Sequence, residues 1–363
     1  MCLNSSGNTA FDKTGTACPE TGNRPALRRA LSRVYVEEGA YAYERTQSIL
    51  GRLPGSTVIP IKDYKNVFNR PNQPAAMQKQ APALILAVLK PPYLYPGAAV
   101  CQDFGERHFF YTSCVMNCPY DCEYCYLQGM YPSGDIVIFV NLEDVFREIS
   151  EVLKEHPLYL CISFDTDLPA LEGLTGFLSD WTDFARKNPS LLLEVRTKSA
   201  ALSAISKLPV TGNMIFAVTV SPDRISRRFE HRTPPLADRL NLARTALSQG
   251  RQVRLCFDPM IRTEDFETLY GELFEQVRTS LPTERLRDVS VGTFRISADY
   301  LKRMRRNRPC EVTVYPYTNT DGVYGYEPEH VRQMLAFARE KLTGFLPKEK
   351  IFFSEELPEG QPL

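Results

Sequence analysis

The sequence predicts an α/β protein whose main part is a partial (β/α)6 barrel of the TIM type. Short apolar, β-branched runs alternate with helical stretches between residues 136 and 296, which is typical of parallel strands covered by helices. About six such units fit in this segment, fewer than the eight of a complete barrel. In a fold of this kind the active site lies at the carboxyl ends of the strands.

The length and composition of the chain limit the number of domains and the kinds of partner that it can have. The chain has 363 residues, of which 43% are hydrophobic and 24% charged, enough for one large domain with an extension or for two domains. Lys plus Arg equals Asp plus Glu, so any nucleic-acid surface must be a local patch. No apolar run reaches the ~18 residues of a membrane span, and no signal peptide is recognisable. We therefore expect a cytoplasmic protein without a membrane partner.

The chain divides into three predicted parts. Residues 1–24 are rich in Ser, Gly, Thr and Asn and predict a loose N-terminal arm. Residues 25–95 predict a small α/β appendage, with a helix over residues 25–50 and a buried strand over residues 83–89. Residues 96–363 then contain the barrel and its C-terminal region.

Each barrel strand is placed by a short apolar run, and each helix by apolar residues at helical spacing. The expected strands are residues 136–140, 158–163, 191–196, 214–220, 253–257 and 289–294. The expected helices are residues 142–153, 174–185, 236–247 and 266–281. Polar residues follow several of these strands. Lys198 is a cation at one strand end and suits a carboxylate ligand, whereas Ser221 is explained equally well as a helix cap.

A cysteine motif follows residue 117. Cys118, Cys122 and Cys125 are spaced CxxxCxxC. Three thiolates on so short a loop can hold three irons of a four-iron cluster and leave the fourth iron open, whereas four cysteines close such a cluster. This is the signature of the radical S-adenosylmethionine (SAM) enzymes, whose open iron binds the amino and carboxylate groups of SAM. Tyr124 can pack beside the adenine. The predicted cofactors are therefore a [4Fe-4S] cluster and SAM.

Other uses of these cysteines fit less well. Zinc ribbons favour two separated CxxC knuckles, and no second knuckle is present. A disulfide framework is disfavoured because 10 Cys are spread over 363 residues. Cys114 precedes the motif by four residues and is the spare, since only the other three complete CxxxCxxC.

Several stretches together resemble the spore photoproduct lyase family of radical SAM enzymes. The most specific are the cysteine loop and residues 221–240, which begin Ser-Pro-Asp-Arg-Ile-Ser-Arg-Arg-Phe-Glu. Also similar are Phe139-Val-Asn-Leu-Glu-Asp, Leu171-Glu-Gly-Leu-Thr-Gly and Arg196-Thr-Lys. The likeness covers roughly residues 45–345. Members of this family repair the thymine dimer that ultraviolet light makes in spore DNA, on a partial (β/α)6 barrel whose C-terminal β-hairpin wedges the DNA open.

The resemblance also assigns roles. It implies that Cys118, Cys122 and Cys125 hold the cluster. It places Tyr124 and Tyr126 at a tyrosine pair that helps to regenerate SAM, and it implies a reductant such as flavodoxin or ferredoxin.

Three further positions follow from the same resemblance. Lys198 falls on a lysine that contacts SAM, and Thr166 and Ser221 are implied as cofactor-binding residues near it.

The hydrogen donor is the first departure from the family pattern. The family has a cysteine where this chain has Phe164. Cys161 is three residues earlier, on the opposite face by the two-residue period of a strand. It serves as the donor only if a bulge turns it, and otherwise it is a core residue. We therefore expect SAM cleavage with weak or absent dimer repair. The alternative function is a radical SAM reaction on a different, non-dimer substrate.

DNA binding is the second departure. The stretch at the family's hairpin begins at Val314 and keeps aromatics that can stack on bases, but it lacks cations for phosphates. A basic run upstream either contacts DNA or is a solvated helix face. Its members are Lys302, Arg303, Arg305, Arg306 and Arg308. A third hypothesis is a non-catalytic nucleic-acid-binding or metal-binding protein with a structural cluster.

Overall fold

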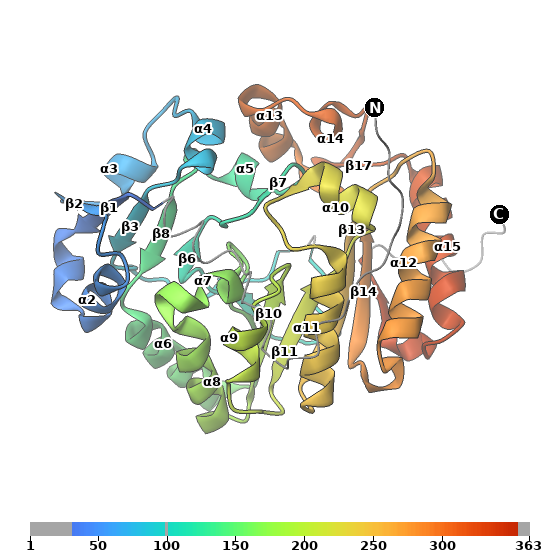
Figure 1. Ribbon diagram of the computed structural model, residues 1–363, viewed down its shortest axis with the longest axis horizontal. Helices are drawn as coiled ribbons and strands as arrows, with labels where there is room; N and C mark the ends of the chain where they lie inside the picture. The colour runs from blue at the N-terminus through green and yellow to red at the C-terminus, as the bar shows by residue number, and fades with distance from the viewer. Residues whose placement is uncertain (1–30, 99–100, 355–363) are drawn as a thin grey trace, which may run out of the picture.

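The computed structural model describes residues 31–98 and 101–354. The predicted arm over residues 1–24 lies outside these residues. Two large β-sheets lie side by side, and the smaller one, which contains the first three strands of the described residues, is on the left in Figure 1. Within the described residues, no helix is both long enough and apolar enough to cross a membrane.

The larger sheet is the partial barrel that the sequence predicts. Its strands lie next to one another in chain order, and all but β4 run parallel to their neighbours. They are β4 (Tyr95–Pro96), β5 (Phe109–Tyr111), β9 (Leu158–Cys161), β10 (Leu191–Thr197), β11 (Met214–Thr219), β13 (Gln252–Met260), β14 (Asp288–Thr293) and β18 (Ile351–Phe353). The strands β4 and β18 are the two edges, so the barrel is open.

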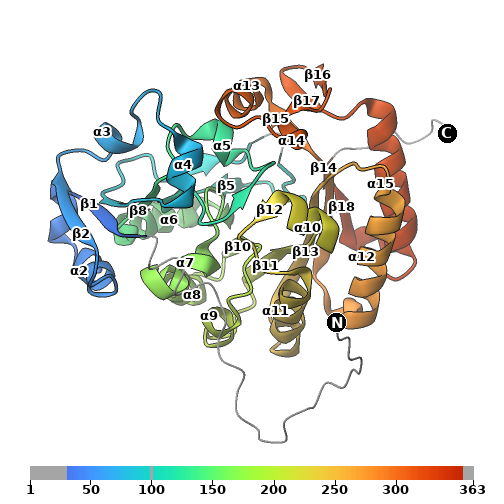
Figure 2. The ribbon, with the colours of Figure 1, turned by 45° about the horizontal axis from the view of Figure 1, so that its top comes forward.

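Helices cover the outer face of this sheet (Figures 1 and 2). They are α6 (Leu142–Glu155), α7 (Leu168–Thr175), α8 (Phe177–Lys187), α9 (Leu202–Ser206), α11 (Leu236–Ser248), α12 (Phe266–Ser280) and α15 (Pro328–Thr343). The single helix expected over residues 174–185 is instead the junction of α7 and α8. Gly176 breaks it because its φ is 70°, a conformation that glycine adopts without a steric cost.

The N-terminal sheet has five strands in the order β2-β1-β3-β8-β6. They are β1 (Arg33–Glu37), β2 (Thr57–Ile61), β3 (Leu84–Ala87), β6 (Val115–Met116) and β8 (Ile136–Phe139). The helix expected over residues 25–50 is wrong over β1, which precedes the 3₁₀ helix at residues 38–42 and the helix α2 (Glu44–Gly51). The run expected to be the first barrel strand is β8, which pairs with β3 in this sheet. The chain therefore passes from the larger sheet into this one between β5 and β6 and returns through α6, between β8 and β9.

The helices of this part are short. They are the 3₁₀ helix η1 (Glu38–Ala42), α3 (Lys65–Phe68) and α4 (Ala75–Gln80), and α5 (Leu127–Met130) follows the cysteine loop. A two-stranded ladder pairs β7 (Asp121–Cys122) of that loop with β12 (Glu230–His231), which follows α10 (Asp223–Phe229).

The C-terminal region contains the expected hairpin. Strands β15 (Arg295–Ser297), β16 (Thr318–Thr320) and β17 (Val323–Gly325) form an antiparallel sheet in the order β15-β17-β16. Asp321 and Gly322 both have positive φ, as a two-residue hairpin turn requires. The helices α13 (Ala298–Asn307) and α14 (Glu311–Val314) lie between β15 and β16, and two 3₁₀ turns, η2 (Thr283–Arg285) and η3 (Lys348–Lys350), flank other strands.

The helix α13 packs directly on α5 of the cysteine loop. A Cβ atom at Gly129 would lie 2.5 Å from the backbone oxygen of Tyr300, so glycine is needed for this approach. The hairpin region and the cysteine loop are thereby joined.

A loop between β4 and β5 enters the open barrel. The Phe104 ring lies 3.1 Å from the Arg254 guanidinium carbon and makes an edge contact with Phe352 of β18. Gln102 donates a hydrogen bond to the backbone oxygen of Phe353, at 3.0 Å. This loop therefore connects the two ends of the open sheet.

Candidate active site

A cavity of about 420 Å³ lies at the carboxyl ends of the barrel strands. The cysteine loop, β9, β10, β13, the segment from β14 to β15 and α13 all contribute to its wall. The wall is largely aromatic on the side of β5 and α13, where Phe109, Tyr111, Phe164 and Tyr300 lie. Thiols and charged side chains occupy the rest. This position is the one predicted for the active site of a parallel α/β barrel.

The cysteine loop is attached to distant parts of the chain. Its strand β7 pairs with β12, and the backbone N–H of Glu123 donates to the oxygen of Phe229 at 2.8 Å. From the N-terminal part, the Lys79 ammonium donates to the backbone oxygen of Cys118 at 2.7 Å. The loop has little regular structure of its own, so these contacts determine where its side chains point.

Cys118, Cys122 and Cys125 all line the cavity, as the sequence predicts. Cys114 does not line it. Its thiol is buried and lies 3.8 Å from the backbone oxygen of Ile162. The structure thus separates the three motif cysteines from the spare one.

The donor set fits an iron–sulfur cluster better than a single metal ion. Within residues 31–98 and 101–354, no three His, Cys, Asp or Glu side chains are grouped closely enough to ligate one ion. In a four-iron cluster each thiolate binds a different iron, so the sulfur atoms stand farther apart than the ligands of one ion. The three thiols share one wall, and none of them forms a disulfide.

Tyr124 is held by a buried carboxylate. Its hydroxyl donates to Glu230, which also accepts hydrogen bonds from Ser221 at 2.8 Å and Ser226 at 3.1 Å. The guanidinium of Arg239, fully buried, forms an ion pair with the same carboxylate. Burial alone would raise the pKa of Glu230, but the positive charges of Arg239 and Lys198 and the hydrogen bonds from Tyr124 and Arg239 together outweigh it and lower the pKa to about 2. Glu230 is therefore a charged hub beneath the cysteine loop.

Lys198 and Thr166 lie on the same cavity wall as the cysteines. The Lys198 ammonium is 5.3 Å from the centroid of the Tyr124 ring. The Lys198 backbone N–H donates to Asp167 at 2.7 Å, which fixes the strand end. The Thr166 hydroxyl is buried and has no hydrogen-bond partner among the described residues, so it is available to a ligand. Ser221 does not line the cavity, because its hydroxyl lies behind Tyr124 on Glu230.

The expectation that Cys161 faces away from Phe164 is wrong. Both side chains line the cavity. Strand β9 ends at Cys161, so the two-residue alternation of a strand does not extend to Phe164. The Phe164 ring stacks on Tyr111 with centroids 4.1 Å apart, and its backbone oxygen accepts a hydrogen bond from Tyr126.

The sequence reasoning missed a second thiol. Cys101, on the loop that enters the barrel, lines the same cavity as Cys161. Cys161 is therefore not the only thiol of the described residues near the end of β9, although the sequence indicated no other one there. No periodic pattern places an irregular loop in space, so the local sequence carries no signal for this contact.

Charged residues were also missed. Arg196, Asp258 and Arg295 line the cavity. Asp258 forms an ion pair with Arg295 at 3.0 Å and lies 3.7 Å from Arg196. Burial would raise the pKa of Asp258, but Arg295 lowers it below its usual value. The available signal was their position at the end of a predicted strand, for Arg196, or directly after one, for Asp258 and Arg295.

The basic run occupies α13 and the residue directly after it, Arg308, beside the cavity. Arg308 forms an ion pair with Asp121 at 2.7 Å, Arg305 donates to the backbone oxygen of Thr313 and Arg303 to that of Met130. The remaining two cations, Lys302 and Arg306, are exposed and have no partner among the described residues.

The chain is similar to known proteins over most of its length. A family model described as "Spore photoproduct lyase" matches residues 110–318. A spore photoproduct lyase from Clostridium acetobutylicum is 25% identical over 178 residues, which are 47% of this chain and 52% of that protein. One from Geobacillus sp. is 23% identical over 256 residues, which are 64% of this chain and 73% of that protein. The chain thus aligns with about half the length of the first of these relatives.

Solved structures share the fold. A spore photoproduct lyase double mutant with bound AdoMet and dinucleoside spore photoproduct superposes with a TM-score of 0.75, at 20% identity over 89% of this chain and 98% of that chain. A spore photoproduct lyase complexed with dinucleoside spore photoproduct gives a TM-score of 0.76, at 19% identity over the same shares. Since the family model spans more than half of the residues and includes the whole cysteine loop, this chain belongs to the spore photoproduct lyase family.

Proposed function

We propose that this chain is a radical SAM lyase that acts on a thymine dimer or another modified nucleobase in DNA. The observation that carries the proposal is the shared cavity of the three motif cysteines, Lys198 and Thr166 at the carboxyl ends of the barrel strands. Cys118, Cys122 and Cys125 would hold a [4Fe-4S] cluster, which with SAM supplies a 5′-deoxyadenosyl radical.

The other residues near the cysteines are suited to hold SAM. The Lys198 ammonium can form a charge-assisted hydrogen bond with a carboxylate. The buried Thr166 hydroxyl offers a donor and an acceptor that no described residue uses. Tyr124, fixed by Glu230, offers a ring against which a cofactor can pack.

The lyase reaction also requires a hydrogen donor. When the bond between two thymines breaks, a carbon radical is left on one of them. A thiol can give this carbon its hydrogen atom and become a thiyl radical, which a tyrosine hydroxyl can then reduce by hydrogen transfer. Cys161 and Tyr126 line the cavity and are suited to these two steps, with Cys101 as a second thiol.

DNA would reach the cavity from the side of α13 and the hairpin. Lys302 and Arg306 are exposed there and can contact phosphates. Chemistry on a base in a duplex requires that the nucleotide leave the stack. The exposed turn of the β16–β17 hairpin, beside Tyr324, is placed to assist this. The dinucleoside lesion in the related solved structures supports a nucleic-acid substrate.

The test is a repair assay with the dinucleotide spore photoproduct, SAM and dithionite, in which the restored thymidine dinucleotide is measured by chromatography. Formation of this repaired dinucleotide that requires SAM would support the proposal. The second candidate, a different substrate, is favoured by Phe164, which occupies the family's thiol position. SAM cleavage without conversion of the dimer to the thymidine dinucleotide would support that candidate.

A further inference from the structure

Two cations in the cavity, Arg196 and Arg295, have no role in the proposed chemistry. Glu194, Arg196 and Lys198 alternate along β10 and its end, so their side chains project from the same face of the strand. All three line the cavity. Lys198 is nearest to the cysteine loop, and Arg196 is two residues deeper in the barrel.

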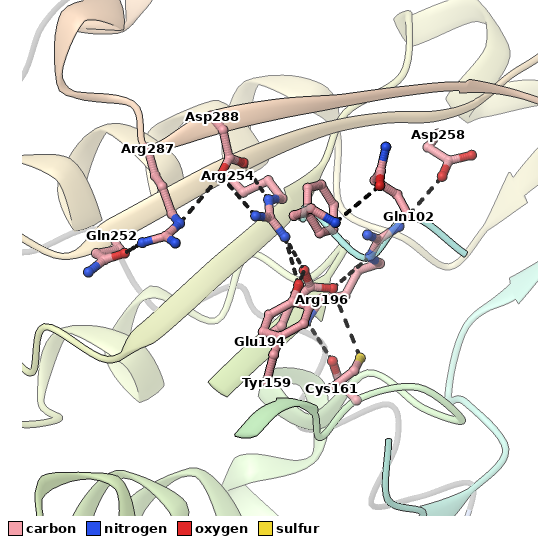
Figure 3. A network of polar contacts seen from close by, with 12 residues as sticks. Gln102, Tyr159, Cys161, Glu194, Arg196, Gln252, Arg254, Asp258, Arg287 and Asp288 are labelled. Carbon is pink, nitrogen blue, oxygen red and sulfur yellow. Dashed lines mark hydrogen bonds and ion pairs between the residues drawn. The ribbon is translucent and has the colours of Figure 1, made fainter. Parts of the chain in front are cut away.

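Two carboxylates position Arg196 (Figure 3). Its Nε donates to Glu194 at 3.2 Å, and its Nη1 lies 3.7 Å from Asp258. Each of these carboxylates also forms an ion pair with a second arginine. Arg254 forms an ion pair with Glu194 at 2.5 Å, and Arg295 forms one with Asp258 at 3.0 Å.

The network has an excess of positive charge. Among the described residues that these ion pairs connect, it contains four arginines and three carboxylates. They are Arg196, Arg254, Arg287 and Arg295 with Glu194, Asp258 and Asp288. Most of the network is buried, and a buried charge without an oppositely charged partner raises the free energy of the folded protein. An anionic ligand would balance it.

The guanidinium of Arg196 has N–H donors that make no hydrogen bond with the described residues. A guanidinium has five N–H donors. Of the guanidinium donors of Arg196, only Nε makes a hydrogen bond with the described residues, because the 3.7 Å from Nη1 to Asp258 is too long for one. The side chain is 31% exposed, and it lines the cavity. Its Nη groups can therefore meet a ligand there.

We infer that Arg196 forms an anion subsite that binds the phosphodiester between the two nucleotides of the substrate. The inference rests on the proposed function and adds a contact to it. A phosphodiester offers two oxygens that match the fork of a guanidinium. The carboxylate of SAM is the other anion in the reaction, but Lys198 lies closer to the cysteines that would hold the cluster.

The test compares two ligands that differ only in this group, the dinucleotide spore photoproduct and the dinucleoside form that lacks the phosphodiester. Their dissociation constants are measured without reductant, for wild type and for Arg196→Gln. We expect wild type to bind the dinucleotide about tenfold more tightly, and Arg196→Gln to bind both forms equally with unchanged affinity for SAM. Arg196→Lys should keep part of the preference.

The variant should still fold, because Glu194 and Asp258 each retain an arginine partner, and thermal unfolding checks this. Arg287→Gln is the matched control. It removes one charge from the same network at a residue that does not line the cavity, and it should keep the preference.

Three results with Arg196→Gln would overturn the subsite. They are a preference that survives in Arg196→Gln, an equal loss for both ligands, and a loss of SAM affinity, which would show that the carboxylate of SAM is the anion. If wild type binds both forms equally, the subsite alone is wrong. If it binds neither, the proposed function fails as well.

Discussion

The phenol of Tyr124 donates a hydrogen bond to the carboxylate of Glu230, 106 residues further along the chain. Tyr124 lies inside the CxxxCxxC motif, between two cysteines. Glu230 belongs to β12, which pairs with β7 of the same loop. The position of the cysteines in the cavity therefore depends on a segment in the second half of the barrel.

Replacing Glu230 by Gln should destabilise the protein strongly. The change leaves Arg239 fully buried without its ion-pair partner, and breaking a buried pair in this way costs about 3–5 kcal/mol. Urea unfolding of the purified variant measures the loss. Glu151→Gln removes an exposed carboxylate that pairs with Lys154 on α6 and should change stability by less than about 1 kcal/mol. Equal effects of the two changes would contradict the role of Glu230 as a hub.

Lys198→Ala should weaken SAM binding by about 1.5–3 kcal/mol, the value of a hydrogen bond to a charged group. Isothermal titration of the cluster-loaded protein with SAM measures this. Lys154→Ala, on the exposed face of α6, serves as the control and should leave the affinity unchanged. If Lys198→Ala binds SAM as tightly as wild type, Lys198 has no part in holding the cofactor.

Glu172 should make stability depend on pH. Its carboxylate accepts hydrogen bonds from the backbone N–H groups of Leu178 and Ser179, and burial raises its pKa from 4.5 to about 7. The native state therefore keeps a proton that the unfolded state releases between these values. The protonated carboxyl of Glu172 therefore contributes to the free energy of unfolding. This stabilisation is full below about pH 4.5 and is lost as the pH rises through 7.

Glu172→Gln should remove this contribution, which amounts to at most about 3 kcal/mol. The measurement is the difference in unfolding free energy between wild type and variant at pH 5 and at pH 8. We expect the variant to gain stability relative to wild type at the higher pH. A constant difference across this window would show that the native pKa is not raised.

Cys161 should supply the hydrogen atom in dimer repair. In D₂O its thiol carries solvent deuterium, so wild type should place deuterium on the thymine product, and Cys161→Ala should not. Cys101→Ala, which removes the other thiol in the same cavity, should keep the transfer. If only Cys101→Ala fails to place deuterium on the product, Cys101 is the donor. If both variants still place deuterium there, Cys161 is excluded as the donor.

The sequence predicts the elements of the barrel well because their signals are local. The run that ends before Lys198 is a strand by its apolar residues alone, and the CxxxCxxC spacing identifies three side chains of one loop. The expected strand at 136–140 is also present, but an apolar run does not say which sheet it joins. Strand β8 lies in the N-terminal sheet, which periodicity cannot show.

The remaining features of the site depend on tertiary contacts. Cys101 reaches the cavity because the loop with Phe104 enters the open barrel and packs under Arg254. The relation of Arg196 to Asp258 joins two strands that are far apart in sequence. Ser221 follows a strand, as a ligand-binding residue would, but its hydroxyl is used by Glu230. Each of these depends on neighbours that no local pattern specifies.

Iron content and reductive SAM cleavage, measured together in the single cysteine variants, test the central claim most directly. Each protein is loaded with iron and sulfide and then incubated with SAM and dithionite, and 5′-deoxyadenosine is measured. We expect wild type and Cys114→Ala to bind a four-iron cluster and form 5′-deoxyadenosine, and Cys118→Ala, Cys122→Ala and Cys125→Ala to lose both. The claim would be contradicted by wild-type protein that holds a full cluster and forms no 5′-deoxyadenosine, or by a motif variant that keeps both properties.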